Sequence, residues 1–545
     1  MVDSDILRPA RYINSEWNAV HKEWGETVLK VALAFPDIYE IGMSHLGMRI
    51  LYGILNGKKD VICERVFALW MDMEKRLRDR KEKLSSLESA HALKEFDIIG
   101  FSLQYEMNYL DVLNILDLGG VPIYSAERED DSPIVIAGGP CAFNPEPLAD
   151  FIDAFVIGEA EEAILEIVNA VKGEGLRVNR RREVVLKKLS EIQGVYVPSF
   201  TNPDRRSGLV SRSSIGMRPA AITKRIVKDL DAAYFPADIV VPYIQIIHDR
   251  IGIEIMRGCP HQCKFCQACK IFNPLRIRSV KRIMEIAEES VKSTGYEELS
   301  LLSLSSGDYP HIEELAKKLE EKFKPLGVKV SLPSLRVGTF EEYSGMDTLK
   351  RAGLTFAPEA GSERLRHALN KKITDAEILE KSRAALSSGW RKVKLYFMIG
   401  LPGETDEDLD AIIDLAGKIK NVNISVSPFI PKPYSDFEKE GMESLENLKE
   451  KQNRLGSRLR AQGSRVRASF HSPEIARIEA ALARGDKNIG KVILKAWEKG
   501  LRLQAWTEHF NYNLWVQAFQ EAGVGPEIYL KKKEAGESLP WGFIK

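Results

Sequence analysis

Short apolar runs alternate with amphipathic stretches through the first 170 residues of the chain. Each run leads into a stretch whose apolar positions recur with helical spacing. Strands that alternate with helices of this length predict βαβ units on a parallel sheet. Residues 1–195 are therefore expected to form a Rossmann-like doubly wound domain. Its expected strands are VLKVALAFP (28–36), DIIGFSLQY (97–105), SPIVIAGG (132–139) and AFVIG (154–158).

The hydrophobic pattern weakens over residues 196–244, where Gly, Ser, Pro and Arg are frequent, and this composition predicts a linker. From residue 245 to 440 the pattern resumes as about six strand–loop–helix repeats, which predict a partial (β/α)6 barrel. In that fold the loops after the strands carry the chemistry. Residues 441–545 are basic and then amphipathic, which predicts a helical C-terminal region. The expected fold class is α/β throughout.

The overall charge is balanced, with 78 basic and 78 acidic residues. This balance provides no general reason to expect nucleic acid or an anionic membrane as the partner. The polar start of the chain lacks the features of a signal peptide. No stretch approaches the roughly 18 apolar residues of a membrane span. The sequence therefore predicts a cytoplasmic protein with no membrane partner.

Four of the six cysteines lie within GCPHQCKFCQACK, residues 258–270. In a reducing compartment such clustering indicates metal or redox chemistry. Cys259, Cys263 and Cys266 form C-x3-C-x2-C, and three thiolates on a four-iron cubane leave one iron open for a ligand. Cys269 completes a second C-x2-C, so a closed four-thiolate zinc site is an alternative. Packing of the four cysteines without any metal is a further alternative.

The C-x3-C-x2-C spacing, with Phe265 before its last cysteine and a strand of a β/α barrel ahead of it, resembles the radical S-adenosylmethionine enzymes. Further motifs extend the resemblance over about 200 residues. They are SSGD (305–308), SLR (334–336), PEAGSERL (358–365) and GLPGET (400–405). The resemblance implies a 4Fe-4S cluster on Cys259, Cys263 and Cys266. It also implies reductive cleavage of S-adenosylmethionine to a 5′-deoxyadenosyl radical.

The same resemblance implies a set of residues around S-adenosylmethionine. In the family, the loop matched by SSGD meets the amino group, and the segment matched by PEAGSERL faces the ribose and carboxylate. Ion pairs at the barrel mouth are the alternative for Arg336 and Lys394, and an ordinary turn is the alternative for SSGD and for GLPGET. The implied cofactor-binding residues are Phe265, Ser306, Gly307, Asp308, Ser334, Arg336, Glu359, Arg364, Lys394 and Gly400.

The front domain is similar to cobalamin-binding domains, and the whole chain is similar to radical S-adenosylmethionine proteins that carry one. The D-x-H-x-x-G signature of histidine-coordinated cobalamin is missing, although His45 precedes Leu46 and Gly47. Cobalamin is therefore expected to bind without histidine or not at all, and a degenerate domain that shapes the active site is the alternative. Members usually have glycine at the position of Cys269, and they often continue beyond residue 545. The possible cobalamin contacts are Gly100, Ser102, Gly138, Gly139 and Gly158.

The sequence thus predicts a radical enzyme that methylates or otherwise modifies a C–H bond of a small-molecule or RNA substrate, with an electron donor such as flavodoxin or ferredoxin. An RNA-modifying enzyme related to the tRNA methylthiotransferases is one alternative. The basic stretch 449–467 would contact phosphates, and Trp497, Trp506 and Trp515 would stack on bases. A solvated helix face and core tryptophans explain the same residues without RNA. A non-enzymatic, cluster-bearing electron carrier is the third alternative.

Overall fold

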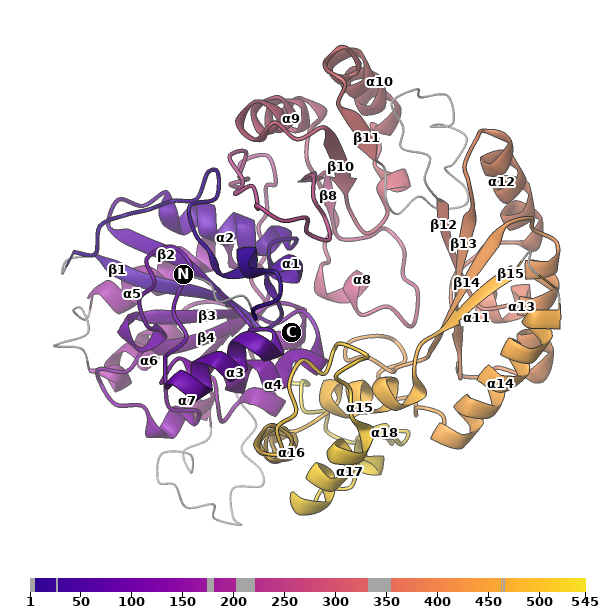
Figure 1. Ribbon diagram of the computed structural model, residues 1–545. Helices are drawn as coiled ribbons and strands as arrows, with labels where there is room; N and C mark the ends of the chain where they lie inside the picture. Colours follow the sequence, from indigo (N-terminus) through magenta and orange to yellow (C-terminus); the bar gives the residue numbers. More distant parts are fainter. Residues whose placement is uncertain are drawn as a thin grey trace. The chain divides into compact units, whose positions relative to one another are not determined.

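A computed structural model describes residues 5–25, 28–173, 181–201, 221–331, 354–461, 463 and 466–545 (Figure 1). The chain forms two compact units. Unit 1 contains Met1–Asp249, Leu482–Pro526 and Ser538–Lys545, and unit 2 contains Arg250–Ala481 and Glu527–Glu537. The residues beyond 440 therefore contribute to both units.

Unit 1 is built on a six-stranded sheet with the order β2-β1-β3-β4-β5-β6. All neighbouring pairs are parallel except β5 with β6. The four strands expected from the sequence are present as β1, β3, β4 and β5, and the structure adds β2 and β6. The bounds are β1 Leu29–Phe35, β2 Val61–Phe67, β3 Ile98–Ser102, β4 Ile134–Gly138, β5 Ala154–Val156 and β6 Val195–Tyr196.

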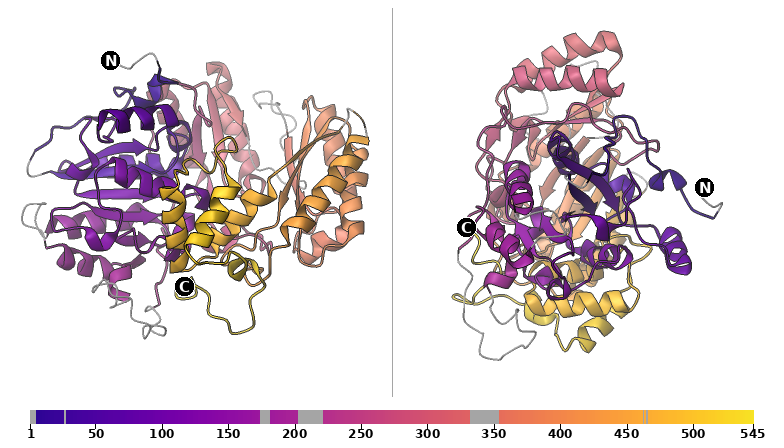
Figure 2. Two further views of the ribbon diagram at one scale, coloured as in Figure 1. Left: turned by 60° about the horizontal axis from the view of Figure 1, so that its bottom comes forward. Right: turned by 90° about the vertical axis from the view of Figure 1, so that its left-hand side faces the viewer.

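Helices surround this sheet (Figure 2). The apolar sides of α2, α5 and α6 share one core with alternate residues of β1, β2 and β4. The α-helices of unit 1 are α1 Tyr39–Gly42, α2 Leu46–Asn56, α3 Met71–Arg80, α4 Tyr109–Leu118, α5 Ala160–Gly173, α6 Arg182–Ser190, α7 Pro198–Thr201, α16 Lys487–Glu498 and α17 Tyr512–Glu521. Its 3-10 helices are η1 Pro9–Tyr12, η2 Leu93–Glu95, η3 Glu106–Asn108, η4 Ser125–Glu127, η5 Pro140–Phe143 and η6 Glu146–Leu148.

The C-terminal helices α16 and α17 are part of unit 1, where α16 packs on α4 and η6. Gly490 of α16 comes so close to η6 that a Cβ there would lie 3.1 Å from the carbonyl oxygen of Pro147. The Asn144 side-chain amide donates hydrogen bonds of 2.9 Å to the carbonyl oxygens of Ala483 and Gly485. These contacts make the end of the chain a structural part of the first domain.

Unit 2 carries two parallel sheets, with the orders β11-β10-β7 and β12-β13-β14-β15, and a short antiparallel pair β8-β9. The described residues between 245 and 440 contain strands of the expected repeats, and β15 is an additional strand beyond them. No closed barrel forms from the residues that the structure describes. The bounds are β7 Ile251–Glu254, β8 Met256–Arg257, β9 Arg276–Ile277, β10 Glu298–Leu302, β11 Lys329–Ser331, β12 Leu354–Glu359, β13 Val393–Ile399, β14 Val422–Pro428 and β15 Val466–Phe470.

The helices of unit 2 alternate with its strands, as a β/α arc requires. In Figure 1, α12, α13 and α14 all lie on the same side of the β12–β15 sheet. No helix in the described ranges is long and apolar enough to cross a membrane. The helices are α8 Ala268–Ile271, α9 Val280–Thr294, α10 Ile312–Phe323, α11 Glu363–Ala368, α12 Asp375–Ser387, α13 Asp406–Gly417, α14 Leu445–Ala461, α15 Pro473–Ala483 and α18 Glu527–Leu530, with 3-10 helices η8 Ser306–Asp308 and η9 Lys324–Leu326.

Candidate functional site

The cysteine loop, residues 258–270, starts directly after β8 and ends in the short helix α8. Gly258 opens it with a φ of 90°, in the left-handed region that favours glycine. A Cβ at this position would lie 2.9 Å from the carbonyl oxygen of Phe272. Only glycine therefore allows the chain to turn sharply from the strand into the loop.

The cysteine loop is held by the segment that follows α11. The Lys264 amide donates to the carbonyl oxygen of Leu369 at 3.0 Å, and the Asn370 side chain donates to the carbonyl oxygen of Gln262 at 2.8 Å. Phe265 packs against a buried apolar cluster that includes Leu369. Phe265, the aromatic residue of the motif, thus anchors the cysteine loop to this cluster within unit 2.

Cys259, Cys263 and Cys266 are half-buried, whereas Cys269 is buried, and none of the chain's six cysteines forms a disulfide. The Cys269 thiol donates to the carbonyl oxygen of Cys266 at 3.0 Å. A hydrogen bond from the Cys269 thiol, together with the amides of Cys269 and Ala268, lowers the pKa of Cys266 to about 6. The same hydrogen bond and burial raise the pKa of Cys269. Cys266 is therefore the thiolate of this pair, and Cys269 keeps its proton.

The donor set fits an iron–sulfur cubane better than a single zinc ion. A structural zinc site brings four ligands to one point. Among the residues that the structure describes, no three His, Cys, Asp or Glu side chains converge in this way. Thiolates around a cubane are instead spread over a cluster of several iron atoms, and they come from closely spaced cysteines on one loop. Three half-buried cysteines with a thiolate among them match that requirement.

The loop after β10 joins the cysteine loop through Asp308. The His261 Nε2 atom lies 2.7 Å from Asp308 Oδ2, and the Ser305 hydroxyl donates to the same oxygen at 2.5 Å. Ser306 and Gly307 are buried beneath them, and the Ser306 hydroxyl lies 3.0 Å from that of Ser303. The structure therefore brings the SSGD motif against the cysteines.

Glu359, at the end of β12, also faces the cysteine loop. Its φ of 72° is uncommon for a residue with a side chain, and such strain is typical of functional sites. The Lys371 ammonium group donates to Glu359 Oε1 at 2.8 Å and lies 5.8 Å from the ring centroid of Phe265. His261 and Lys371 were not expected as site residues. His261 lies inside the cysteine motif, but nothing in the sequence indicates a role for Lys371.

Arg364 and Gly400 have structural partners. Arg364 is exposed, donates to the carbonyl oxygen of Gly403 at 3.0 Å and pairs with Asp408 at the start of α13. Burial by itself would raise the pKa of Asp408. Hydrogen bonds from Ser362, the Thr405 amide and Arg364 together lower this pKa by a larger amount, so its net shift is downward. The Gly400 amide donates to Glu404 Oε2 at 2.8 Å. These contacts join the loops after β12 and β13.

Lys394 lies near the amino end of β13, whereas Gly400 follows the carboxyl end. At about 3.3 Å per residue, roughly 20 Å of strand separates the two residues. Lys394 therefore does not lie beside the cysteine loop, and its ammonium group donates to the Tyr396 hydroxyl at 2.7 Å. Ser334 and Arg336 lie outside the described residues.

In unit 1, three of the five expected cobalamin contacts face the protein itself. A Cβ on Gly139 would lie 2.5 Å from the Leu103 carbonyl oxygen, and one on Gly158 would lie 2.2 Å from that of Arg225. Gly100 is buried in the middle of β3. Ser102 and Gly138 remain, at the carboxyl ends of β3 and β4, and a Cβ on Gly138 would meet only ordinary contacts from 3.6 Å. Ser102 and Gly138 thus have more room beside them than Gly139 and Gly158, and all five residues stay predictions.

His45 has a structural task that agrees with the missing D-x-H signature. Its Nδ1 atom accepts a hydrogen bond of 3.3 Å from the Met48 amide and so caps helix α2. Burial lowers the pKa of His45 to about 4, so its imidazole is neutral at physiological pH. His45 is thus a buried, helix-capping residue of the fold.

The order of the sheet reverses between β1 and β3, where open α/β sheets bind ligands at their carboxyl edge. Asp37 follows β1 at this place and accepts hydrogen bonds from Trp506 Nε1 at 2.9 Å and from the Asn108 side chain at 3.2 Å. Burial raises the pKa of Asp37. Trp506, which is far from Asp37 in the sequence, thus covers part of the carboxyl edge of the sheet. The sequence did not predict this contact.

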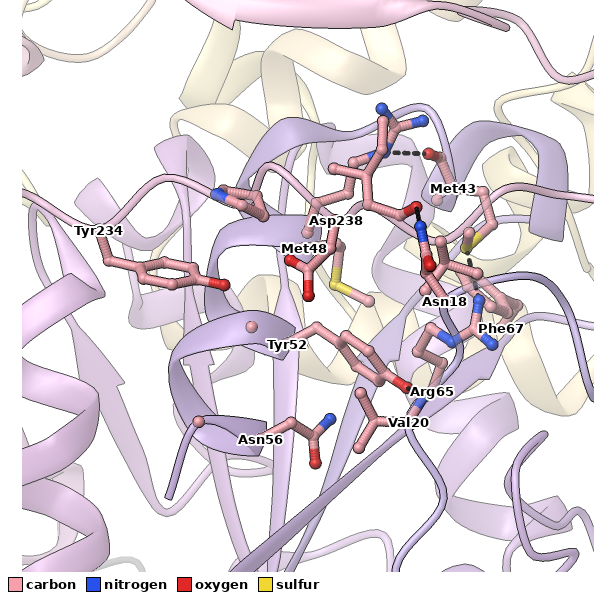
Figure 3. A pocket seen from close by; sticks show the side chains of 17 residues that line it. Asn18, Val20, Met43, Met48, Tyr52, Asn56, Arg65, Phe67, Tyr234 and Asp238 are labelled. Atoms are coloured by element: carbon pink, nitrogen blue, oxygen red, sulfur yellow. Dashed lines mark hydrogen bonds between the residues drawn. The ribbon is translucent and has the colours of Figure 1, made fainter. Parts of the chain in front are cut away.

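A cavity of about 200 Å³ lies beside α2 in unit 1 (Figure 3). Its wall includes Met48 and Tyr52 of α2 and Phe67 of β2. The Asp238 carboxylate and the Tyr234 hydroxyl point into it from the opposite wall. The cavity is thus mainly apolar with a few polar groups, as many small-molecule pockets are.

Many of the residues that could have contacted RNA are engaged within the protein. On α14, Lys449, Lys451, Arg454 and Arg458 all pair with carboxylates. The tryptophan Nε1 atoms of the C-terminal region have partners as well. Trp497 donates to Asn114, Trp506 to Asp37, and the fully buried Trp515 to Gln504. These contacts favour the structural explanation of both features.

Comparison with known proteins agrees with the site. Residues 47–198 match the N-terminal region of radical SAM proteins, and residues 253–416 match the radical SAM superfamily. An uncharacterized protein of Methanocaldococcus jannaschii is 31% identical over 510 residues, covering 92% of this chain and 99% of that protein. An uncharacterized methyltransferase of Pyrococcus horikoshii is 26% identical over 368 residues, covering 65% of this chain and 71% of its own length.

The fold is similar to that of the radical S-adenosylmethionine methyltransferase TsrM from Kitasatospora setae, solved with cobalamin and a [4Fe-4S] cluster bound. The TM-score is 0.51 at 15% identity, and the similarity covers 73% of this chain and 75% of TsrM. The two family matches lie in the two halves of the chain, and the cysteine loop lies inside the second match, residues 253–416. The chain therefore belongs to the radical S-adenosylmethionine superfamily, whose members are enzymes that use a 4Fe-4S cluster to cleave S-adenosylmethionine.

Proposed function

We propose that Cys259, Cys263 and Cys266 hold the cluster and that Cys269 supports it without being a ligand. The supporting observation is the division of the four cysteines. The Cys266 thiol has a lowered pKa, whereas Cys269 is buried and its thiol donates to the carbonyl oxygen of Cys266. Three ligands leave one iron open, which a fourth thiolate would close. The open position is where S-adenosylmethionine would bind.

The remaining site residues would position S-adenosylmethionine. When bound, the cluster and S-adenosylmethionine supply the electron and the 5′-deoxyadenosyl radical. Asp308 and Glu359 are carboxylates beside the cysteine loop, and each is fixed by a partner, His261 or Lys371. A carboxylate held in place binds an ammonium group or ribose hydroxyls with little loss of side-chain entropy. Phe265 holds the cysteine loop against a buried apolar cluster of unit 2.

We further propose that the reaction is a methyl transfer to a C–H position of the substrate. The methyltransferase of Pyrococcus horikoshii supports this reaction class, because it aligns with 65% of this chain. Unit 1 has a doubly wound sheet with Ser102 and Gly138 at its carboxyl edge, and His45 is a buried residue that caps α2. Cobalamin would therefore bind there without histidine coordination.

The cysteine assignment is tested with four variants, each reconstituted anaerobically with iron and sulfide. Cys259→Ala, Cys263→Ala and Cys266→Ala should each lose the cluster, measured as iron content and visible absorbance, and should form no 5′-deoxyadenosine. Cys269→Ala is the matched control and should keep the cluster. Full 5′-deoxyadenosine formation by any one of the first three variants would overturn the assignment.

The reaction class is tested separately with S-adenosylmethionine that carries a deuterated methyl group. Transfer of the label to a product, together with cobalamin retained after anaerobic purification, supports methyl transfer. Production of 5′-deoxyadenosine and methionine with no labelled product, from protein that retains no cobalamin, would replace methyl transfer by hydrogen abstraction alone.

A further inference from the structure

The two faces of the β12–β15 sheet differ in chemistry. The helices α12, α13 and α14 cover one face of the sheet (Figure 1). The strands carry buried apolar residues such as Phe356, Leu395 and Ile424 on that face. The strand register places hydrogen-bonding side chains in rows on the other face. The first row is Thr355, Lys394, Asn423 and Arg467, and the second contains Tyr396, Ser425 and Ser469.

The face that carries these two rows lies opposite the helices, and in a closed β/α barrel it would form the interior. Rows of polar side chains are unusual there. Closed β/α barrels fill their interior with layers of bulky branched side chains, because the interior is a packed core. Burying Lys394 or Arg467 in such a core would carry a large desolvation cost. The face is accessible instead, since Thr355, Arg467 and Ser469 are exposed and Tyr396 is 37% exposed.

The charge on this face is positive and uncompensated. Neither row contains an acidic residue, and among the described residues no carboxylate forms an ion pair with Lys394 or Arg467. The cations of neighbouring α14 differ, because Lys451 and Arg454 each pair with carboxylates. Neighbouring strands lie about 4.8 Å apart, so two strand spacings place the backbones of Lys394 and Arg467 roughly 10 Å apart. Two cations at this separation suit one oxyanion between them.

Tyr396 adds a donor to the cations. Its hydroxyl oxygen accepts a hydrogen bond of 2.7 Å from the Lys394 ammonium group. The Tyr396 O–H proton is therefore directed away from Lys394 and is available to a ligand oxygen. An arginine fork, an ammonium group and a hydroxyl are the donors that carboxylates and phosphates bind.

We propose that this face binds an anionic group of the substrate, a carboxylate or a phosphate, between Lys394 and Arg467. The inference rests on the proposed function, which places the reacting carbon at the cysteine end of the strands. Lys394 and Arg467 lie near the amino ends of their strands, and roughly five residues of strand, about 17 Å, separate their row from that end. The substrate is therefore an elongated molecule with its anion remote from the reacting position.

Pyridoxal 5′-phosphate tests this face without knowledge of the substrate. Its aldehyde condenses with a lysine amine with loss of water, and borohydride then reduces the imine to a stable amine that mass spectrometry locates. The phosphate of the probe should direct it to Lys394. Lys392, which is exposed and lies two residues from the half-buried Lys394, is the internal control. We expect several-fold faster labelling of Lys394 than of Lys392, and protection of Lys394 by inorganic phosphate or by succinate.

Arg467→Gln should remove most of this protection, while Arg460→Gln, an exposed cation outside both rows, should leave it intact. Protection of Lys394 by phosphate but not by succinate would identify the anionic group of the substrate as a phosphate. Protection by succinate but not by phosphate would identify it as a carboxylate. Equal labelling of Lys392 and Lys394, or protection that Arg467→Gln does not change, would overturn the proposal. The labelling is repeated on protein without the cluster, so a failed cysteine assignment would not alter its result.

Discussion

His261 Nε2 lies 2.7 Å from Asp308 Oδ2, and this contact connects the loop between the first two motif cysteines with the loop after β10. His261 comes from the cysteine motif and Asp308 from the SSGD motif, 47 residues later. The two loops that the cluster and S-adenosylmethionine would share are thus joined by side chains of the protein itself. His261 is therefore a positioning residue for Asp308.

His261→Ala should weaken S-adenosylmethionine binding by about tenfold, since a hydrogen bond to a charged group contributes about 1.5 kcal/mol or more. Equilibrium dialysis of the reconstituted protein measures the affinity, and iron content shows whether the cluster is intact. His261→Gln can still donate to Asp308 and should restore much of the affinity. If His261→Ala binds S-adenosylmethionine as tightly as the wild type while its iron content is normal, the positioning role is wrong.

Cys266 should react as a thiolate at neutral pH in the cluster-free protein. Its pKa is lowered to about 6, first by the hydrogen bond from Cys269, so the alkylation rate of Cys266 should rise between about pH 5 and 7 and then level off. Peptide-resolved alkylation with iodoacetamide measures this profile. Cys269→Ala should move the rise to higher pH, whereas Cys269→Ser keeps a donor and should move it less. An unchanged profile in Cys269→Ala would contradict the assigned hydrogen bond.

Trp506→Phe should destabilise unit 1 more at high pH than at low pH. The hydrogen bond from Trp506 opposes the effect of burial and favours the ionised form of Asp37, so its loss matters most when that carboxyl is charged. We expect a loss of about 1 kcal/mol where Asp37 is protonated and about 1.5–3 kcal/mol where it is ionised. Urea unfolding at pH 5 and pH 8 measures the difference.

Trp497→Phe is the control for that experiment, because Trp497 donates to the neutral Asn114 side chain at 3.3 Å. Its cost should be nearly the same at both pH values. If Trp506→Phe lowers the free energy of unfolding by the same amount at pH 5 and pH 8, Asp37 does not titrate between these pH values.

Gly158→Ala should lower the melting temperature whether or not cobalamin is present. Gly158 has a φ of 102°, and a Cβ there would lie 2.2 Å from the Arg225 carbonyl oxygen. The backbone strain alone costs about 1–3 kcal/mol, and the steric overlap adds to it. Gly138→Ala, whose Cβ has room, is the control and should be tolerated in the cobalamin-free protein. A Gly158→Ala protein as stable as the wild type would show that this edge is open to a ligand.

The sequence by itself determined the elements and the chemistry. The apolar runs predicted β1, β3, β4 and β5 because strands buried on both faces are continuously hydrophobic. The cysteine spacing predicted the reactive loop because ligands within one loop depend only on local chain geometry. β15 was not predicted, since its exposed positions interrupt the apolar pattern. Edge strand β2 was likewise found only in the structure.

The tertiary structure decided which residues meet. Lys394 and Gly400 lie on one short stretch of sequence, yet the extended backbone of β13 places them at opposite ends of that strand. Gly158 suggested room for a ligand, but the backbone of Arg225 occupies that space. Trp506 suggested a stacking surface, but the fold directs its indole to Asp37, 469 residues away. Contacts across such distances depend on the packing of whole elements, whereas a motif records only the residue types and their spacing along the chain.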